Sequence, residues 1–163
     1  MDRAEQSSLD LGTTFEPVTL DLPWPPSINS YFMEYGMPPA GALVEQQIRD
    51  HGFEGLHVWL RQHTRVMKRV GEKGHQYRAD VQECVLRNRL NKGYREPLLM
   101  YMDFYAPDRR QRDLDNHYKP LIDALEHACV FLDDSQIKGH RTLMQQEIIK
   151  GGKVVVRLEE LVY

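Results

Sequence analysis

The chain has 163 residues and a formal net charge of −3, with 41% hydrophobic and 28% charged residues. This length allows one domain with a substantial core and is short for two, and the composition is that of an ordinary soluble protein. No run of eighteen apolar residues exists and the polar N-terminus does not resemble a signal peptide, so we expect a cytoplasmic protein with no membrane contact.

The N-terminal part of the sequence is the hardest to assign. Residues 1–17 look like a flexible acidic tail. Residues 18–22 alternate in hydrophobicity and predict a first strand, which the following prolines end. Residues 33–63 have weak patterns, in which we expect a loop and then two helical segments, over 37–41, 42–49 and 56–62.

The C-terminal part gives clearer predictions. Residues 74–91 carry one apolar stripe at helical spacing, and residues 97–105 alternate as a strand that leads into an arginine-rich loop. A second helix begins near Asn116 or His117, with Asp115 or Asn116 as its N-cap. Two last strands, over 141–149 and 154–158, are joined through two glycines, which is typical of a tight hairpin.

The order of these elements is strand, helix, strand, helix, strand, strand, without an internal repeat. It predicts a single α/β (α+β) domain, with helices packed on a mixed β-sheet. Cys84 and Cys129 fall on apolar stripes of the predicted helices, and we expect both to be buried, reduced thiols.

The small negative total charge hides a basic segment. Residues 61–95 contain ten lysines or arginines and three acids, so this window carries +7 and the rest of the chain −10. A local positive field attracts a phosphate backbone, although a solvated helix face rich in arginine is the alternative. Within the window, Lys68, Arg69 and Lys73 are the candidate contacts to a DNA backbone.

The most informative stretch runs from Asp108 to Asn116. Asp113 and Asp115 are one residue apart, so on extended backbone their carboxylates point to the same side and can hold a hard cation. Oxygen ligands suit Mg²⁺ or Mn²⁺, which usually share a phosphate with the substrate. Three arginines beside the pair can bind phosphate bidentately: Arg109, Arg110 and Arg112. The stretch indicates a metal-dependent phosphodiester site.

Five blocks of sequence, taken together, resemble the RusA family of phage- and prophage-type Holliday junction resolvases. They are Leu22–Asn29 with Tyr31, Gln76–Arg78, Asp108–Asn116 with Lys119, Phe131–Gln136, and the turn at Lys150–Gly152. The resemblance covers residues 18–32 and 64–160. Residues 33–63 look like an insertion beside shorter relatives, and the acidic tail is also extra.

The resemblance implies a Mg²⁺-dependent homodimeric endonuclease of a bacterium or phage-infected cell, which cuts four-way junction DNA and for which Mn²⁺ can substitute. The metal-binding aspartates fall on Asp113, Asp115 and Asp134, and the essential lysine on Lys119. Metal ions activate water and stabilise developing charge. Lys119, one helical turn after Asp115, can stabilise the transition state as a point charge, while the arginines position DNA without cleaving it.

Several alternatives stay open at this stage. The aspartates and arginines alone also fit a surface salt-bridge cluster. Trp24 can stack on a base or pack against the core, and Asp123 can orient Lys119 or form a merely structural ion pair. As a whole, the chain could be a branched-DNA-binding protein without catalysis, or a different metal-dependent nuclease.

Overall fold

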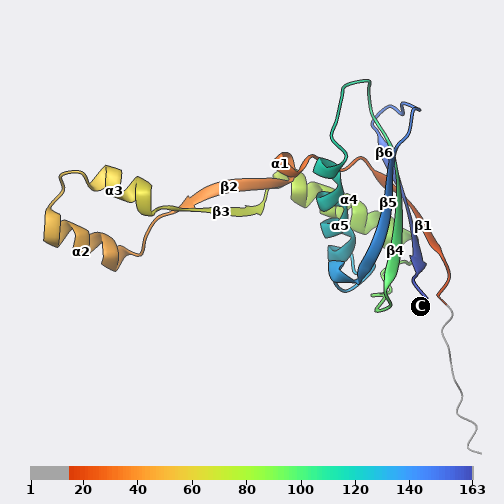
Figure 1. Ribbon diagram of the computed structural model, residues 1–163, viewed down its shortest axis with the longest axis horizontal. Coiled ribbons are helices and arrows are strands. Elements are labelled where there is room, and N and C mark those ends of the chain that lie inside the picture. The colour runs from red at the N-terminus through yellow and green to blue at the C-terminus, as the bar shows by residue number, and fades with distance from the viewer. Residues whose placement is uncertain (1–14, 163) are drawn as a thin grey trace, which may run out of the picture.

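The computed structural model describes residues 15–162, which form a body and a long projecting arm (Figure 1). The body is built on a four-stranded sheet in the order β1-β6-β4-β5. Central strand β4 pairs parallel to β5 and antiparallel to β6, and β6 pairs antiparallel to β1. The strands are β1 (Val18–Pro23), β4 (Leu98–Tyr105), β5 (Ile137–Met144) and β6 (Lys153–Glu160). The predicted fold class, an α/β domain with a mixed sheet, is confirmed.

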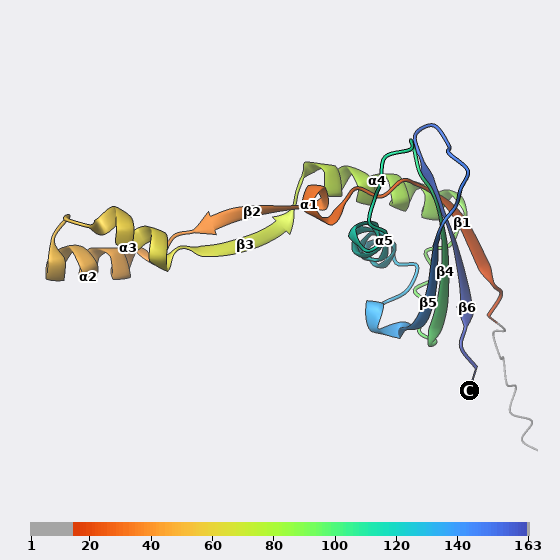
Figure 2. The same ribbon diagram turned by 45° about the horizontal axis from the view of Figure 1, so that its top comes forward.

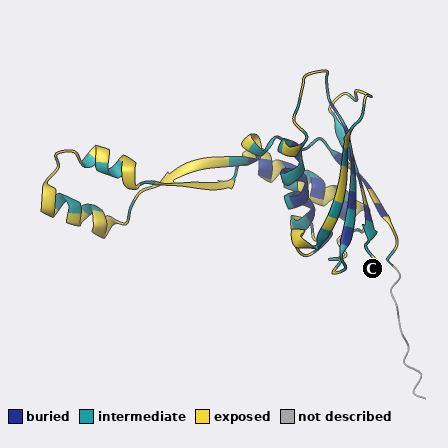
Figure 3. Cartoon of the chain, viewed as in Figure 1, coloured by how far each residue is buried: buried dark blue, intermediate teal, exposed yellow. Residues whose placement is uncertain are grey.

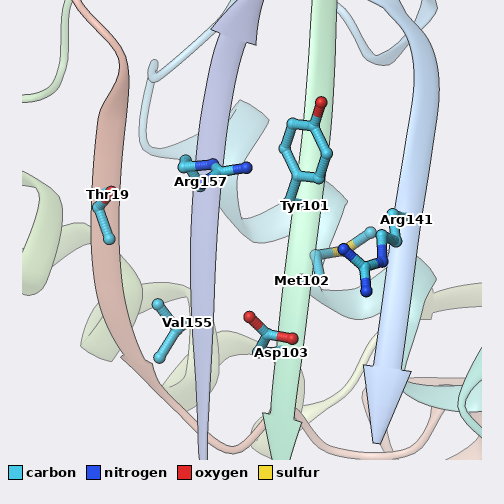
Figure 4. Close-up of a pocket in the computed structure, with 7 residues that line it drawn as sticks. All are labelled: Thr19, Tyr101, Met102, Asp103, Arg141, Val155 and Arg157. Atoms are coloured by element: carbon cyan, nitrogen blue, oxygen red, sulfur yellow. The ribbon is translucent and has the colours of Figure 1, made fainter.

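Helices α4 (Glu72–Arg87) and α5 (Asp115–His127) cover one face of the sheet (Figure 2). Strand β4 alternates between buried and half-buried residues, because every second side chain points at these helices. The core side of β4 consists of four apolar residues, as the alternation predicts: Leu98, Met100, Met102 and Phe104. The opposite face of the sheet carries polar side chains, among them Asp103, Arg141 and Arg157 (Figure 4).

The order of elements in the body matches the prediction, but the prediction that the last two strands form a hairpin was wrong. Strand β4 lies between β5 and β6, so the last two strands are not paired. Because β5 runs parallel to β4, the chain must cross the end of β4 before β6 begins. The crossing segment is held by backbone bonds from Gln145 to Phe104 (2.8 Å) and from Ile149 to Ala106 (3.0 Å). Gly151 and Gly152 still reverse the chain before β6, with positive φ angles of 89° and 70°.

The arm comprises residues 32–70. Strands β2 (Phe32–Met37) and β3 (Arg65–Val70) form an antiparallel ribbon, and helices α2 (Gly41–His51) and α3 (Leu56–His63) lie at its far end. No residue of the arm is buried (Figure 3). The two predicted helices are confirmed, whereas the ribbon strands were not predicted from the sequence.

The arm starts and ends at one place on the body. Short helix α1 (Ile28–Tyr31) ends in a fully buried tyrosine, and the backbone N–H of Gly71 donates to the carbonyl of Tyr31 at 2.8 Å. A Cβ atom on Gly74 would lie 2.5 Å from the same carbonyl oxygen. Only glycine therefore fits where α4 crosses the root of the arm.

Three smaller predictions need correction or restriction. The N-cap of α5 is Leu114, and Asp115 is the first helical residue, where its carboxylate accepts the N–H of Asn116. Cys129 is exposed, because α5 ends two residues earlier and Cys129 adopts a left-handed turn with φ of 58°. Of the predicted tail, residues 1–14 lie outside the described residues, whereas Phe15 packs on Tyr94 with ring centroids 4.5 Å apart. No helix among the described residues is long and apolar enough to cross a membrane.

Candidate active site

The loop between β4 and α5 is organised by the carboxylate of Asp108. It accepts hydrogen bonds from the backbone and guanidinium of Arg110, at 2.8–3.0 Å, and lies 2.8 Å from the guanidinium of Arg112. The bonds from Arg110, and then that from Arg112, hold the pKa of Asp108 well below its usual range. Arg109 is exposed and forms no ion pair with a described residue. The loop therefore presents positive charge in a fixed arrangement.

Trp24 joins this loop to the sheet. Its ring makes edge contacts with Phe104 and His117, at centroid distances of 5.7 and 4.8 Å, and the Arg112 guanidinium lies over it at 5.7 Å. His117 is bonded to the carbonyl of Pro25 at 2.8 Å, and its burial lowers its pKa. Trp24 thus packs against the core, which is one of the two alternatives that the sequence analysis left open for this residue.

Asp113 and Asp115 are exposed at the start of α5. Asp113 accepts a long bond of 3.4 Å from the Asn116 side chain, and Asp115 accepts the Asn116 backbone N–H at 3.1 Å. Within the described part of the chain, neither carboxylate forms an ion pair. Both retain free oxygen atoms for a cation, which is the ligand chemistry that Mg²⁺ prefers.

Lys119 connects α5 with the turn that follows it. Its Nζ lies 2.8 Å from Asp123 and 3.0 Å from Asp134. The hydrogen bond to Asp123, followed by that to Asp134, raises the pKa of Lys119, so that it stays charged at neutral pH. Asp123, for which two roles were open, directly contacts Lys119.

The adjacent aspartates Asp133 and Asp134 have different environments. Asp133 is the N-cap of the 3-10 helix Asp134–Gln136 and forms a capping box with Gln136. Its side chain accepts the N–H of Ser135 at 2.8 Å. Asp134 instead turns its carboxylate to Lys119. This arrangement assigns Asp133 to the local fold and leaves Asp134 available to the site.

Sequence reasoning missed Glu126, the third acidic residue on α5. Oxygen atoms of Asp123, Glu126 and Asp134 lie within 4.8 Å of one another, the one such acidic group among residues 15–162. Burial, followed by the neighbouring carboxylates, raises the pKa of Glu126. The available signal was the i, i+3 spacing of Asp123 and Glu126 on one helix face. Arg78 and Lys119 line the same polar hollow.

The predicted metal ligands are only partly brought together. Asp113 and Asp115 share the start of α5, but they do not join Asp134 in a three-residue group within 4.8 Å. Asp134 lies instead with Lys119, Asp123 and Glu126. The predicted set of three aspartates therefore stays a prediction, which would require Asp134 to exchange its lysine contact for a metal ion.

The candidate DNA contacts fall into two places. Lys73, in the first turn of α4, lines the same hollow as Arg110 and Arg112. Lys68 and Arg69 lie on β3 in the arm, where Lys68 pairs with Glu34 at 3.2 Å. The basic residues thus extend from the arginine loop to the arm.

Comparison with known proteins adds to this geometry. Residues 58–159 match the family model for the endodeoxyribonuclease RusA, and the chain belongs to this family. It is similar to the crossover junction endodeoxyribonuclease RusA of Escherichia coli strain K12, with 29% identity over 143 residues, which are 88% of this chain and 94% of the relative. The enzyme of the same name from Shigella sonnei is 28% identical with the same coverage. That of Enterobacteria phage 82 is 28% identical over 142 residues, 87% and 93% of the two chains.

Proposed function

We propose that this protein is a structure-specific endonuclease that resolves Holliday junctions by paired phosphodiester hydrolysis. The proposal rests on the RusA family membership, because the relatives are crossover junction endodeoxyribonucleases. The observation that carries it is the position of Lys119. Lys119 lies one helical turn after Asp115 on α5, and its ammonium faces the carboxylate of Asp134.

The chain supplies two kinds of positive charge for this reaction. Arg109, Arg110 and Arg112 present guanidinium groups that suit phosphate oxygens and would hold the DNA backbone, together with Lys73. Lys119 stays protonated at Nζ, since its two carboxylate neighbours raise its pKa. Its ammonium can therefore donate a hydrogen bond to a phosphate oxygen or a departing oxygen.

A metal ion fits the acidic residues of the site. Asp113 and Asp115 offer exposed carboxylate oxygens without ion-pair partners among the described residues, and Asp134 is the proposed third ligand. Bound there, Mg²⁺ (or Mn²⁺ in its place) lowers the pKa of water and acts as a Lewis acid. With Asp134 as a metal ligand, Lys119 would keep Asp123 as a partner at 2.8 Å, and its remaining N–H groups could contact substrate.

Symmetric resolution of a four-way junction requires two cuts on opposed strands. One chain carries one copy of the proposed site, so we infer that the active species is a homodimer with a two-fold axis, which presents two identical sites to the junction.

Cleavage of a synthetic four-way junction tests the proposal. We expect paired symmetric nicks with Mg²⁺, no nicks in EDTA or with Asp115→Asn, and no cleavage of linear duplex. Asp133→Asn is the matched control, because it removes an equally exposed charge that caps a turn, and it should cleave normally. Junction binding without cleavage, in Mg²⁺ and in Mn²⁺, would reject the nuclease and favour a branched-DNA-binding protein.

A further inference from the structure

The ribbon of the arm has two different faces, which follow from its strand register. Opposed residues of an antiparallel pair point to the same side. One face carries Glu34 paired with Lys68, and Gly36 opposite Val66. The other, here called the methionine face, carries Met33, Tyr35, Met37, Arg65, Met67 and Arg69.

The methionine face is exposed although it is largely apolar. Met33, Tyr35, Met37 and Met67 each expose 38–45% of their surface. Arg69 lies across them, with its guanidinium 5.3 Å from the Tyr35 ring centroid and its Nε 3.3 Å from the sulfur of Met33. Within the described residues, neither Arg65 nor Arg69 has a carboxylate partner. The face therefore combines unpaired positive charge with polarisable and aromatic groups.

We propose that the methionine face binds DNA at the branch point of the junction, with Tyr35 stacked on an exposed base and Arg65 and Arg69 on the flanking phosphates. The inference rests on the proposed function, which it deepens by assigning a substrate contact to the arm. Stacking of bases on aromatic side chains, with arginines on the backbone, is how proteins bind unpaired nucleotides. Methionine is also among the apolar side chains that proteins insert between base steps.

The chemistry of the face favours base planes over base edges. Reading base edges in a groove requires hydrogen-bonding side chains, such as asparagine, glutamine or several arginines. Here four of the six side chains are methionine or tyrosine. Planar base faces are accessible where duplexes meet at a branch point, and they are covered by stacking within a continuous duplex.

The same residues disfavour a second copy of the chain as the occupant. A two-fold contact between identical methionine faces would bring Arg65 and Arg69 of both chains into one interface. The only acid in the two strands, Glu34, is on the opposite face and already pairs with Lys68. Two unpaired arginines from each chain would then be buried together, which is unfavourable for a protein contact and favourable for a polyanion.

The position of the ribbon suits a contact close to the cleavage site. Its strands follow Tyr31, whose hydroxyl bonds to Arg78 at the wall of the hollow that also contains Lys119 and Asp134. Six residues of extended chain reach about 20 Å. The ribbon therefore begins beside the hollow that contains Lys119 and Asp134, and its far end lies within about 20 Å of that beginning.

Photo-cross-linking tests this contact directly. A four-way junction with 5-iodouracil at the branch point is bound to the Asp115→Asn protein and irradiated, and the linked peptide is identified by mass spectrometry. We expect linkage to Tyr35, and much less when the iodouracil is moved to the middle of one duplex arm. Linkage at the branch point to a peptide outside the arm would overturn the inference.

Affinity measurements separate the roles of the face. Tyr35→Ala should weaken junction binding by about 5- to 150-fold, with an unchanged salt dependence because no charge is lost. Arg65→Ala and Arg69→Ala should each reduce the salt slope by about one. Val66→Ala is the matched control, since this exposed residue lies on the opposite face, and it should bind normally.

The outcomes distinguish this inference from the proposed function. If the wild-type protein neither binds nor cuts the junction, the proposed function fails. If it cuts the junction and Tyr35→Ala binds as well as wild type, the inference alone fails. If Tyr35→Ala shifts the protein to a smaller oligomer in sedimentation without DNA, the face is a subunit contact and the inference is wrong.

Discussion

The Nε–H of Arg78 donates a hydrogen bond of 2.6 Å to the hydroxyl of Tyr31. The tyrosine ring is buried at the root of the arm, while Arg78 belongs to α4 and lines the polar hollow beside Lys119. Burial raises the pKa of Tyr31, so its hydroxyl remains protonated at neutral pH. One hydrogen bond therefore ties the origin of the arm to the wall of the candidate site.

Replacement of Tyr31 by phenylalanine should lower stability by about 1–2 kcal/mol, because a charged donor loses its partner in a half-buried position. The measurement is urea denaturation, in which the midpoint should fall without a change in slope. Tyr77→Phe is the control, since that buried tyrosine makes a longer bond of 3.3 Å to the carbonyl of Pro23. An equal or larger loss in the control would contradict the importance of the Arg78 contact.

The two glycines of the β5–β6 connection should respond differently to alanine. Both have positive φ, so each substitution strains the backbone by about 1–2 kcal/mol. At Gly152 the new Cβ would also lie 2.9 Å from Trp24 and 3.0 Å from Pro107, whereas at Gly151 it meets nothing within 4 Å. Gly152→Ala should therefore be less stable than Gly151→Ala by a further 1–3 kcal/mol or so. Equal free energies of unfolding for Gly151→Ala and Gly152→Ala, measured by urea denaturation, would contradict this packing.

The aspartate pair after α5 should separate stability from activity. Asp133→Ala removes an N-cap, and should lower the urea midpoint while junction cleavage continues. Asp134→Asn should abolish cleavage and leave the midpoint almost unchanged, because the amide oxygen can still accept the bond from Lys119. Full cleavage by Asp134→Asn would remove this residue from the proposed site.

The pKa of Asp108 gives a pH-dependent prediction. Hydrogen bonds from Arg110 and then Arg112 favour the charged carboxylate in the folded protein, so its pKa lies below the ordinary value of 3.8. The charged Asp108 carboxylate therefore stabilises the folded state at pH values above its unfolded-state pKa. This contribution is lost as pH falls through the lower pKa that Asp108 has in the folded state. Carboxyl ¹³C NMR should show a midpoint below 3.8, and Arg110→Ala should move it upward. A wild-type midpoint at the ordinary value would mean that the arginines are free of Asp108 in solution.

The elements that sequence patterns predicted well are those that bury one face. Strand β4 and helix α5 carry apolar stripes that the core requires, so their periodicity is visible without neighbours. The last two strands were detected, but their pairing was not. Two glycines reveal that the chain reverses, and they carry no information on which strand fills the place beside β6.

The ribbon and part of the site depend on contacts that a single sequence does not reveal. Strands β2 and β3 bury no residue, so the usual alternation between core and solvent is missing. Asp113, Asp115 and Lys119 could be selected from spacing and from the family resemblance. For Glu126 the one signal was its i, i+3 spacing from Asp123, because its acidic surroundings arise only when the turn at Asp134 approaches α5.

The backbone hydrogen bond between Gly71 and Tyr31 holds the two ends of the arm together on the body. The chain between these ends can therefore lengthen or shorten without moving α1 or α4. Closing a longer loop costs little additional free energy, about 0.6 kcal/mol for each doubling of its length. The family match itself begins at residue 58, within the arm. With this arrangement, evolution can change how far the arm extends from the body while the core and the proposed site stay as they are.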